Sequence, residues 1–363
     1  MIWRNLFRRK VRSLLTIAGV AIGIAAVVSL VAMGDGFYSQ MNSMLSKGGA
    51  DLAVRQDKAA DMTLSALDES VGQGMATIPG VEAVSGLVMG FASAPDSPYL
   101  LVYGYDPQEY AIRHFKIIEG TKLAGQRQAI LGKGAAKNLK LRVGQSLKLF
   151  STSFRVVGIY ETGTPFEDGG LVISLKDAQA VFKKPQQVSF FQLKLKQPER
   201  AEEIKKIVEA RYPEAFAAKS AEFSESSQDV QTTRSMTWGL SLIALLVGGI
   251  GVMNTMIMSV FERTREIGVL RAVGWRRRRI ILMVLQESLL LSLMGGLVGI
   301  GLGIGLIQLI SSAPGIGSIL SGTISPGLFL QAMGVALALG AVGGLYPAWR
   351  ASRLSPMEAL RYE

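Results

Sequence analysis

The sequence predicts a membrane protein with four transmembrane α-helices and a large α+β extracytoplasmic domain inserted between the first and second helices. The chain of 363 residues contains four apolar runs, each long enough for the roughly 20 residues that cross a bilayer. Between the first two runs, residues 35–234 contain no stretch of that kind. Basic residues gather beside the apolar runs, which is typical of cytoplasmic segments.

The net charge of +11 would also fit a nucleic-acid-binding protein, but its distribution argues against that class. Residues 35–234 hold 24 Lys+Arg and 23 Asp+Glu, a balance of only +1. The remainder holds 15 Lys+Arg and 5 Asp+Glu, so +10 lies on short segments that flank apolar runs. We therefore expect the lipid bilayer as a partner, no nucleic acid, and cytoplasmic N- and C-termini.

The first apolar run, residues 13–34, follows five basic residues and no acid in residues 1–13. A secretory signal peptide begins in the same way, but its apolar core usually has about 7 to 15 residues and ends at an A-x-A-type site. This run is longer and no such site follows it, so we expect a retained first helix. Gly19 and Gly23 form a small-xxx-small pair through which a neighbouring helix can approach, although glycines are common in membrane helices anyway.

The segment between the first two spans predicts an α+β domain in two lobes. With no cysteine in the chain, this domain must be held together by its hydrophobic core. The polar run 221–234 contains neither Pro nor Gly and predicts a helical stalk, with a flexible linker as the alternative. β-Branched and aromatic runs predict strands at 51–56, 98–105, 145–150, 154–160, 171–174 and 188–196, and helices are predicted at 64–78, 133–139, 175–182 and 198–211.

Catalytic and metal-binding patterns are sparse in this domain. Gly132-Lys133-Gly134 lacks the glycine spacing and the following Ser/Thr of a phosphate-binding loop. His114 is the only histidine, and we expect it on the surface or partly packed. Glu167 and Asp168 lie in a Gly/Pro-rich stretch that predicts a solvated hairpin. We expect no catalytic residue, no metal site and no cofactor in this chain.

The loop 262–279 joins the second and third spans and carries seven arginines and two glutamates. Residues 267, 270 and 274 fall on one face at helical spacing, which predicts a short amphipathic helix. Trp275 suits a membrane interface. From the charges alone, a basic anchor that fixes topology is the simpler interpretation.

The third span contains Gly295, Gly299 and Gly303, which place a glycine at every fourth residue along one face. This stripe predicts a close helix contact, and we expect it to join two copies of the chain. Glu287, near the arginines 276–279, is expected to pair with arginine or to extend toward the interface. The predicted segments are 1–13 cytoplasmic, 14–34 first span, 35–220 extracytoplasmic domain, 221–234 stalk, 235–261 second span, 262–279 cytoplasmic loop, 280–310 third span, 311–326 external loop, 327–347 fourth span and 348–363 cytoplasmic tail.

The loop sequence ERTREIGVLRAVG at 262–274 resembles the loop between the second and third helices of MacB/FtsX-like ABC transporter permeases (type VII, related to LolC and LolE). In that family a coupling helix in this loop docks on a cytoplasmic ATPase. The runs ILGKGAAKNLKLRVGQ at 130–145 and FRVVGIY at 154–160 are similar to the MacB-like periplasmic core, and YPAWRASRLSPMEALR at 346–361 to the family's tail. The resemblance covers most of the chain and is weakest between 57 and 128.

The resemblance implies a non-catalytic permease of the mechanotransmission type in the bacterial inner membrane, which exports or extracts an amphiphilic substrate. It implies a cytoplasmic ABC ATPase in two copies that binds ATP and Mg²⁺, a second permease copy or a homologous permease, and a periplasmic adaptor or acceptor protein. The alternatives are an FtsX-like regulator of an external cell-wall hydrolase and a membrane sensor. The ATPase-contact residues implied are Glu262, Arg263, Arg265, Glu266, Ile267, Gly268, Val269, Leu270, Arg271, Ala272 and Gly274.

Overall fold

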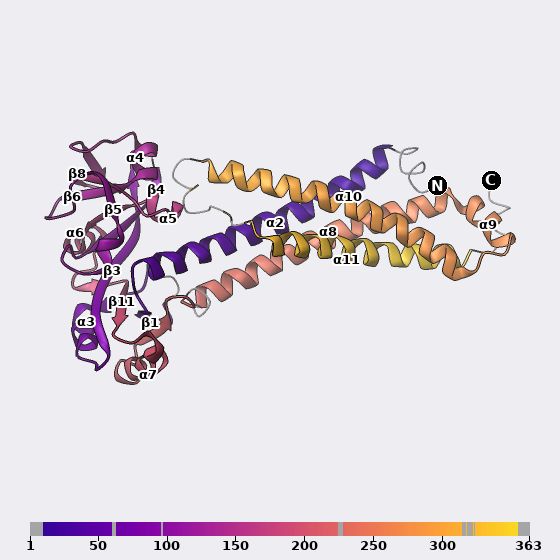
Figure 1. Ribbon diagram of the computed structural model, residues 1–363. Coiled ribbons are helices and arrows are strands. Elements are labelled where there is room, and N and C mark those ends of the chain that lie inside the picture. The colour runs from indigo at the N-terminus through magenta and orange to yellow at the C-terminus, as the bar shows by residue number, and fades with distance from the viewer. Residues whose placement is uncertain are drawn as a thin grey trace. The chain divides into compact units, whose positions relative to one another are not determined.

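The computed structural model describes residues 10–59, 63–95, 97–223, 228–313, 317, 322 and 324–354. The chain divides into two compact units (Figure 1). We call Met1–Gly34, Arg234–Leu309 and Gly322–Glu363 the helical unit, and Asp35–Thr233 with Ile310–Ser321 the sheet unit.

Among the described residues, four helices are long and apolar enough to cross a membrane, as the sequence predicts. The first helix continues to Lys47, well beyond residue 34. The fourth span was expected to end at Pro347, but the last helix contains this proline in its interior and continues to Ser352. The helices are α2 (Lys10–Lys47), α8 (Gln228–Glu262), α10 (Arg277–Ser311) and α11 (Pro326–Ser352), and the short α9 (Thr264–Ala272) lies between α8 and α10 in the chain.

The glycine stripe of α10 packs against α2 of the same chain. A Cβ atom added to Gly299 would lie 2.7 Å from the Ala21 carbonyl oxygen and 2.8 Å from Ile24 Cβ. Added Cβ atoms at Gly295 and Gly303 would meet α2 equally closely, at Val20 and Val28. The stripe is thus filled within one chain, which corrects the expectation that it joins two copies.

The glycines of the first span differ from each other. A Cβ on Gly23 would lie 3.2 Å from the Ala244 carbonyl oxygen of α8, so this glycine marks a close approach of two helices. Gly19 has no such neighbour within 4 Å. On α11, Gly340 faces Ser292 of α10, and Gly343 faces Val252 of α8, so glycines also bring α11 close to its neighbours.

The sheet unit is built on ten strands in one sheet, with a separate two-stranded pair. The main order is β12-β1-β11-β3-β4-β9-β6-β8-β5, with β7 paired to β8; β4 with β9 and β6 with β8 are parallel. The strands are β1 (Leu52–Gln56), β2 (Leu67–Asp68), β3 (Val81–Ala94), β4 (Ser97–Tyr105), β5 (Lys116–Gly120), β6 (Gln128–Gly132), β7 (Ser146–Leu149), β8 (Thr152–Glu161), β9 (Leu171–Ser174), β10 (Gln187–Val188), β11 (Phe190–Leu195) and β12 (Ala215–Lys219).

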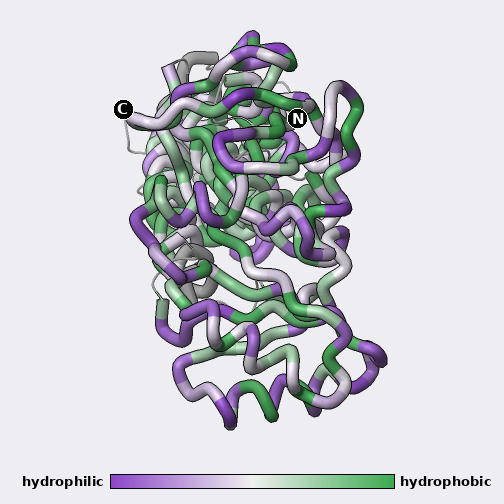
Figure 2. The backbone as a smooth tube through the Cα atoms, turned by 90° about the vertical axis from the view of Figure 1, so that its left-hand side faces the viewer, coloured by the Kyte–Doolittle hydropathy of each residue, from purple (hydrophilic) through white to green (hydrophobic). Residues whose placement is uncertain are grey.

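The central strands of the sheet are buried on both faces, because helices cover each face. In β1, Leu52 and Val54 point into one apolar cluster and Ala53 into another, as the period of two requires. Figure 2 shows hydrophobic residues interleaved with hydrophilic ones along the chain. The first cluster includes residues of α3 (Glu69–Ala76), α4 (Lys133–Leu139), α6 (Leu175–Phe182) and α7 (Ala201–Arg211), and the second includes residues of α2, η1 (Ala111–His114) and α5 (Pro165–Asp168); η2 (Pro198–Arg200) precedes α7.

The predicted helices at 133–139 and 175–182 have the bounds of α4 and α6. The longest strand, β3, was not predicted, since its sequence VEAVSGLVMGFASA is rich in small residues that lower β-propensity. Those small residues have a packing role. A Cβ on Gly90 would lie 2.6 Å from Phe182 Cε1, and one on Gly86 would lie 3.0 Å from Val188 Cγ1.

Candidate functional site

Helix α9 forms the connection between α8 and α10 at one end of the helical unit. The chain leaves the helical conformation at Arg263, where φ is −110° and ψ is 17°. The Thr264 hydroxyl then donates to the Phe261 carbonyl at 2.7 Å. At the other end, Gly274 adopts a φ of +97°, and the Trp275 amide donates back to the Leu270 carbonyl at 3.0 Å. A left-handed glycine of this kind ends a helix and releases the last carbonyls to new partners.

The inner face of α9 is fixed to the helical unit by apolar contacts. Ile267 is 2% exposed and belongs to the same cluster as Val260 and Ile280. Leu270 and Trp275 are half-buried and pack against that cluster. Burying one such side chain contributes about 1.5–3 kcal/mol, so α9 is held as part of the bundle end and is not a free loop.

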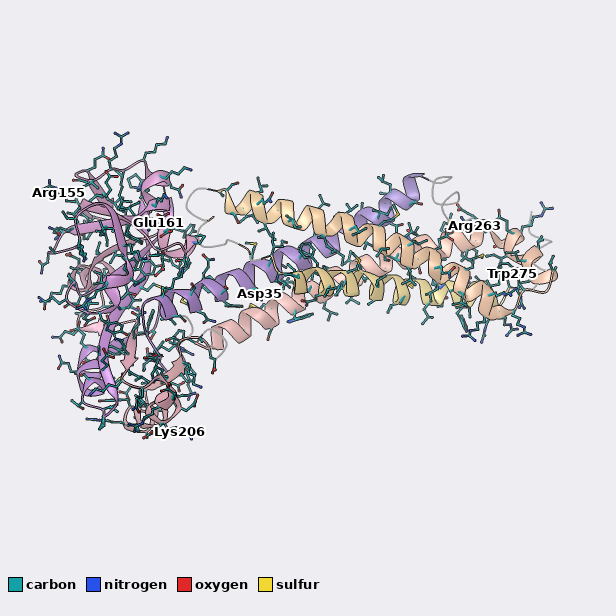
Figure 3. All side chains as sticks on the ribbon, viewed as in Figure 1. Asp35, Arg155, Glu161, Lys206, Arg263 and Trp275 are labelled. Carbon is teal, nitrogen blue, oxygen red and sulfur yellow. The ribbon has the colours of Figure 1, made fainter. Side chains whose placement is uncertain are left out.

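An ion pair stabilises this arrangement beside the apolar contacts. Arg263 Nη1 donates to Glu287 Oε2 at 2.8 Å, and the two side chains are 19% and 13% exposed. Figure 3 shows Arg263 and Trp275 at the same end of the helical unit. Glu287 therefore pairs with an arginine, as expected, but with Arg263 and not with the cluster 276–279. The pair joins the start of α9 to α10 and satisfies a carboxylate inside an apolar helix.

The Glu287→Gln variant should lower the free energy of unfolding by about 1.5 kcal/mol, because it removes a charge-assisted hydrogen bond from a mostly buried pair. Thermal unfolding of the purified protein in detergent measures the change. Glu266→Gln is the matched control, since this glutamate is exposed on α9 and should lose almost nothing. Equal losses in the two variants would contradict a stabilising role for the Arg263–Glu287 pair.

The outer face of α9 is exposed and mixed in character. Val269 is 45% exposed and Val273 is 76% exposed. Gly268 is buried, whereas Ala272 is exposed. Both were expected to touch an ATPase, but they do not lie on one contact face. Of the other residues expected to touch an ATPase, Glu262, Arg265, Glu266 and Gly274 are exposed, Arg263, Leu270 and Arg271 are half-buried, and Ile267 is buried.

Arg271 is tied into the chain, because its Nη1 donates to the Trp275 carbonyl at 3.4 Å. Arginines near α9 also stack on aromatic rings. The Arg279 guanidinium lies 5.9 Å from the centre of the Trp275 ring, and the Arg350 guanidinium lies 4.7 Å from that of Phe261. These guanidinium groups thus make cation–π contacts with the aromatic residues at this end of the helical unit.

The polar residues of the sheet unit form a structural network around α5. His114 Nε2 lies 2.7 Å from Glu167 Oε1, and Glu167 is fully buried, which corrects the expected solvated hairpin. Thr164 donates its hydroxyl to the other Glu167 oxygen at 2.7 Å. Asp168 accepts from the Thr162 amide at 2.7 Å. Sequence reasoning missed the His114–Glu167 pair because its members are 53 residues apart. Within the described ranges, no group of three or more His, Cys, Asp and Glu is placed to hold a metal ion.

Two family models match the chain, one in its N-terminal part and one in its C-terminal part. The MacB-like periplasmic core domain matches residues 13–211, and the FtsX-like permease C-terminal domain matches residues 238–356. The first model includes α2 and most of the sheet unit, and the second includes α9 with α10 and α11.

Relatives align over nearly the whole chain. The macrolide export ATP-binding/permease protein MacB of Bdellovibrio bacteriovorus is 29% identical over 99% of this chain and 61% of its own length. The ABC transporter permease YknZ of Bacillus subtilis is 30% identical over 99% of this chain and 97% of its own. The pyoverdine export ATP-binding/permease protein PvdT of Pseudomonas syringae pv. tomato is 28% identical over 99% and 58%.

The chain thus spans about three fifths of two relatives whose names include an ATP-binding function, and nearly all of a relative named a permease. The two matched domains and the four membrane-length helices occur together in one order. The chain belongs to the MacB/FtsX-like family of ABC transporter permeases.

Proposed function

We propose that this chain is the permease subunit of an ATP-driven transporter of the mechanotransmission type. ATP and Mg²⁺ bind to a separate cytoplasmic ATPase, and its movements pass through α9 to the sheet unit on the outer side of the inner membrane. The observation that carries the proposal is the two-sided α9. Ile267 and the Arg263–Glu287 pair fix its inner face to the bundle, while Glu266, Val269 and Ala272 are exposed on its outer face.

The continuity of α2 supports mechanical transmission. This helix runs from Lys10 to Lys47 without a break and contributes to both units. In the helical unit, Val20 and Ile24 are buried in the apolar cluster. In the sheet unit, Met41 and Met44 are at most 1% exposed, and the Phe166 amide donates to the Gln40 side chain at 2.8 Å. A helix anchored at both ends can transmit a tilt or a shift along its length.

Two permeases would be needed, because four helices do not enclose a wide pathway. We propose a second copy or a homologous permease, with two ATPase subunits below. Helix α8 has a wide apolar exposed surface that lipid or the second permease would cover, including Leu242, Ile243, Leu246, Val247 and Ile250.

The cargo we propose is an amphiphile such as a lipoprotein, a peptide or an antibiotic, exported or extracted at the outer face. Support comes from the names of relatives, which specify macrolide export and pyoverdine export. The match of residues 13–211 to the MacB-like core also favours transport. The alternative is an FtsX-like regulator that activates an external cell-wall hydrolase, which the C-terminal match favours. Copurification distinguishes them: a periplasmic adaptor or outer-membrane channel indicates export, and a hydrolase indicates regulation.

The topology implied by this function is testable with reporter fusions. Fusions after Lys58 and Lys206 should report an external location, and fusions at Gly274 and after Glu363 a cytoplasmic one, because basic residues concentrate beside the spans. Paired enzyme reporters, one active only outside and one only inside, measure this directly. An internal location for Lys206 would contradict the arrangement, since residues 35–234 would then lie on the side of the ATPase.

A further inference from the structure

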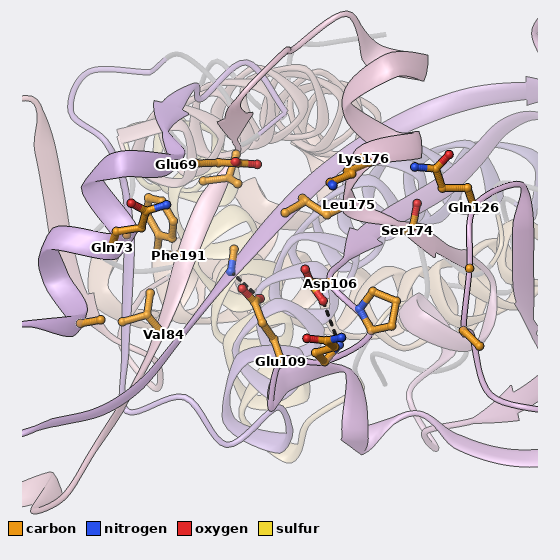
Figure 4. Close-up of a pocket in the computed structure, with 18 residues that line it drawn as sticks. Glu69, Gln73, Val84, Asp106, Glu109, Gln126, Ser174, Leu175, Lys176 and Phe191 are labelled. Carbon is orange, nitrogen blue, oxygen red and sulfur yellow. Dashed lines mark hydrogen bonds between the residues drawn. The ribbon is translucent and has the colours of Figure 1, made fainter.

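The sheet unit contains a cavity of 580 Å³ that the ATP-coupling function does not use (Figure 4). It is lined by residues of α3, of strands β3 and β11, of the start of α6, and of the loops 106–109 and 124–126. A volume of this size lies within the range of about 300–1,000 Å³ in which proteins hold small organic ligands.

One side of the cavity is apolar. Val84 and Phe191 line it from the main sheet, Val188 lines it from β10, and Leu175 lines it from the start of α6. Phe191 and Val188 are almost fully buried within the core, so this wall is fixed by packing and does not depend on a ligand for its shape. Such a surface favours the apolar body of a ligand.

The charged lining is predominantly acidic. Glu69, Asp106 and Glu109 contribute three carboxylates, and Lys176 contributes the only ammonium group among the lining residues. Figure 4 shows Asp106 and Glu109 beside each other, with Glu69 on the opposite side of the cavity. The lining therefore carries a net negative charge, which excludes an anionic ligand as the best fit and favours a cation.

Glu109 is the most constrained of these carboxylates. Its Oε2 accepts from the Ser85 hydroxyl at 2.6 Å and from the Gly86 amide at 3.0 Å. Its Oε1 accepts no hydrogen bond from the residues that the structure describes. Burial raises the pKa of Glu109 most, the two donors lower it, and the negative charges of Asp106 and Glu69 raise it further. A cation beside Oε1 would stabilise the carboxylate and so oppose the rise in its pKa.

We infer that this cavity binds an amphiphilic amine, with its ammonium group beside Glu109 and Asp106 and its apolar body against Phe191, Val188 and Leu175. An organic cation fits better than a metal ion, because the three carboxylates do not form a metal-binding group in the described part of the chain. A small molecule fits this volume better than a peptide segment does. Binding requires neither ATP nor α9, and this inference and the proposed function can therefore fail separately.

The test uses the full chain in lipid nanodiscs titrated with dansylcadaverine, a primary ammonium on an apolar fluorescent body. Empty nanodiscs of the same lipid give the partitioning background. N-acetyl-dansylcadaverine, which keeps the apolar body and loses the charge, should bind about tenfold more weakly. Equal binding of the charged and uncharged probes would overturn the inference.

Three variants separate recognition from folding. Glu109→Gln should weaken dansylcadaverine binding about tenfold while its amide oxygen still accepts from Gly86. Glu199→Gln removes an exposed carboxylate outside the cavity and should leave binding unchanged. Lys176→Ala removes the competing cation and should tighten binding about twofold, a gain that a folding defect would not produce.

Two results with these variants would overturn the inference. One is the same affinity in Glu109→Gln and Glu199→Gln. The other is weaker binding in Lys176→Ala. Saturable binding of a lysine-rich peptide without binding of dansylcadaverine would likewise assign the cavity to a protein partner and contradict a small-amine site.

Discussion

Gly299→Leu should lower the free energy of unfolding of the protein by about 3 kcal/mol, the upper part of the range for an overpacked site. Even a Cβ atom at this position would lie 2.7 Å from the Ala21 carbonyl oxygen, and backbone atoms of α2 cannot move aside as a flexible side chain can. A leucine must therefore push α10 away from α2 or distort both helices. Thermal or denaturant unfolding in detergent measures the loss.

Gly301→Leu is the matched control on the same helix. Gly301 is exposed and has no atom within 4 Å of an added Cβ, so the same substitution there should cost little. The oligomeric state of Gly299→Leu should equal that of Gly301→Leu, since the stripe is filled within one chain. If Gly299→Leu instead dissociates a dimer and leaves the stability of the monomer unchanged, the stripe is an interface between copies.

Val269→Asp should weaken binding of the cytoplasmic ATPase about 100-fold, the loss expected at a central interface residue. Val269 is 45% exposed at the centre of the outer face of α9, so the substitution removes little buried contact within the chain. The variant should unfold at the wild-type temperature, and its affinity for the purified ATPase and the ATP turnover of the complex should both fall.

Arg277→Ala is the control for charge alone. Arg277 is exposed, and Arg276, Arg278 and Arg279 remain to hold the topology, so ATPase binding should change little. Gly268→Trp is unsuitable as the test variant, because Gly268 is buried and a tryptophan there would disturb the permease itself. Full binding by Val269→Asp together with lost binding by Arg277→Ala would make the loop a basic anchor.

The membrane helices were predictable because the bilayer imposes a length and an apolar composition that can be read locally. The same holds for α4 and α6, whose amphipathic patterns are complete within a few residues. Strand β3 was not predicted, because its small residues make room for aromatic rings of distant segments. The Phe182 ring packs on Gly90, and the Phe191 ring lies near Gly86. Such a contact cannot be inferred from the sequence before the strand pairing is known.

The functional residues divide in the same way. The spacing of Ile267 and Leu270 predicted an amphipathic helix, but Ile267 and Gly268, both expected to touch an ATPase, are buried in this chain. Composition does not say which side of a short helix meets the bundle. The stripe at 295, 299 and 303 was recognised, while its partner helix was not. The His114–Glu167 pair joins distant segments, and neither residue has a local pattern that indicates the other.

In the proposed function, ATP hydrolysis below the membrane moves the sheet unit through continuous helices. The chain has no cysteine, so two exposed positions can be labelled selectively as Lys206→Cys in the sheet unit and Leu330→Cys in the helical unit. Pulsed electron paramagnetic resonance on the complex with the ATPase then gives the distance between the two spin labels. We expect a different distance distribution with bound ATP than without nucleotide, and no difference in Val269→Asp. An identical distribution in both states of the intact complex would contradict mechanical coupling.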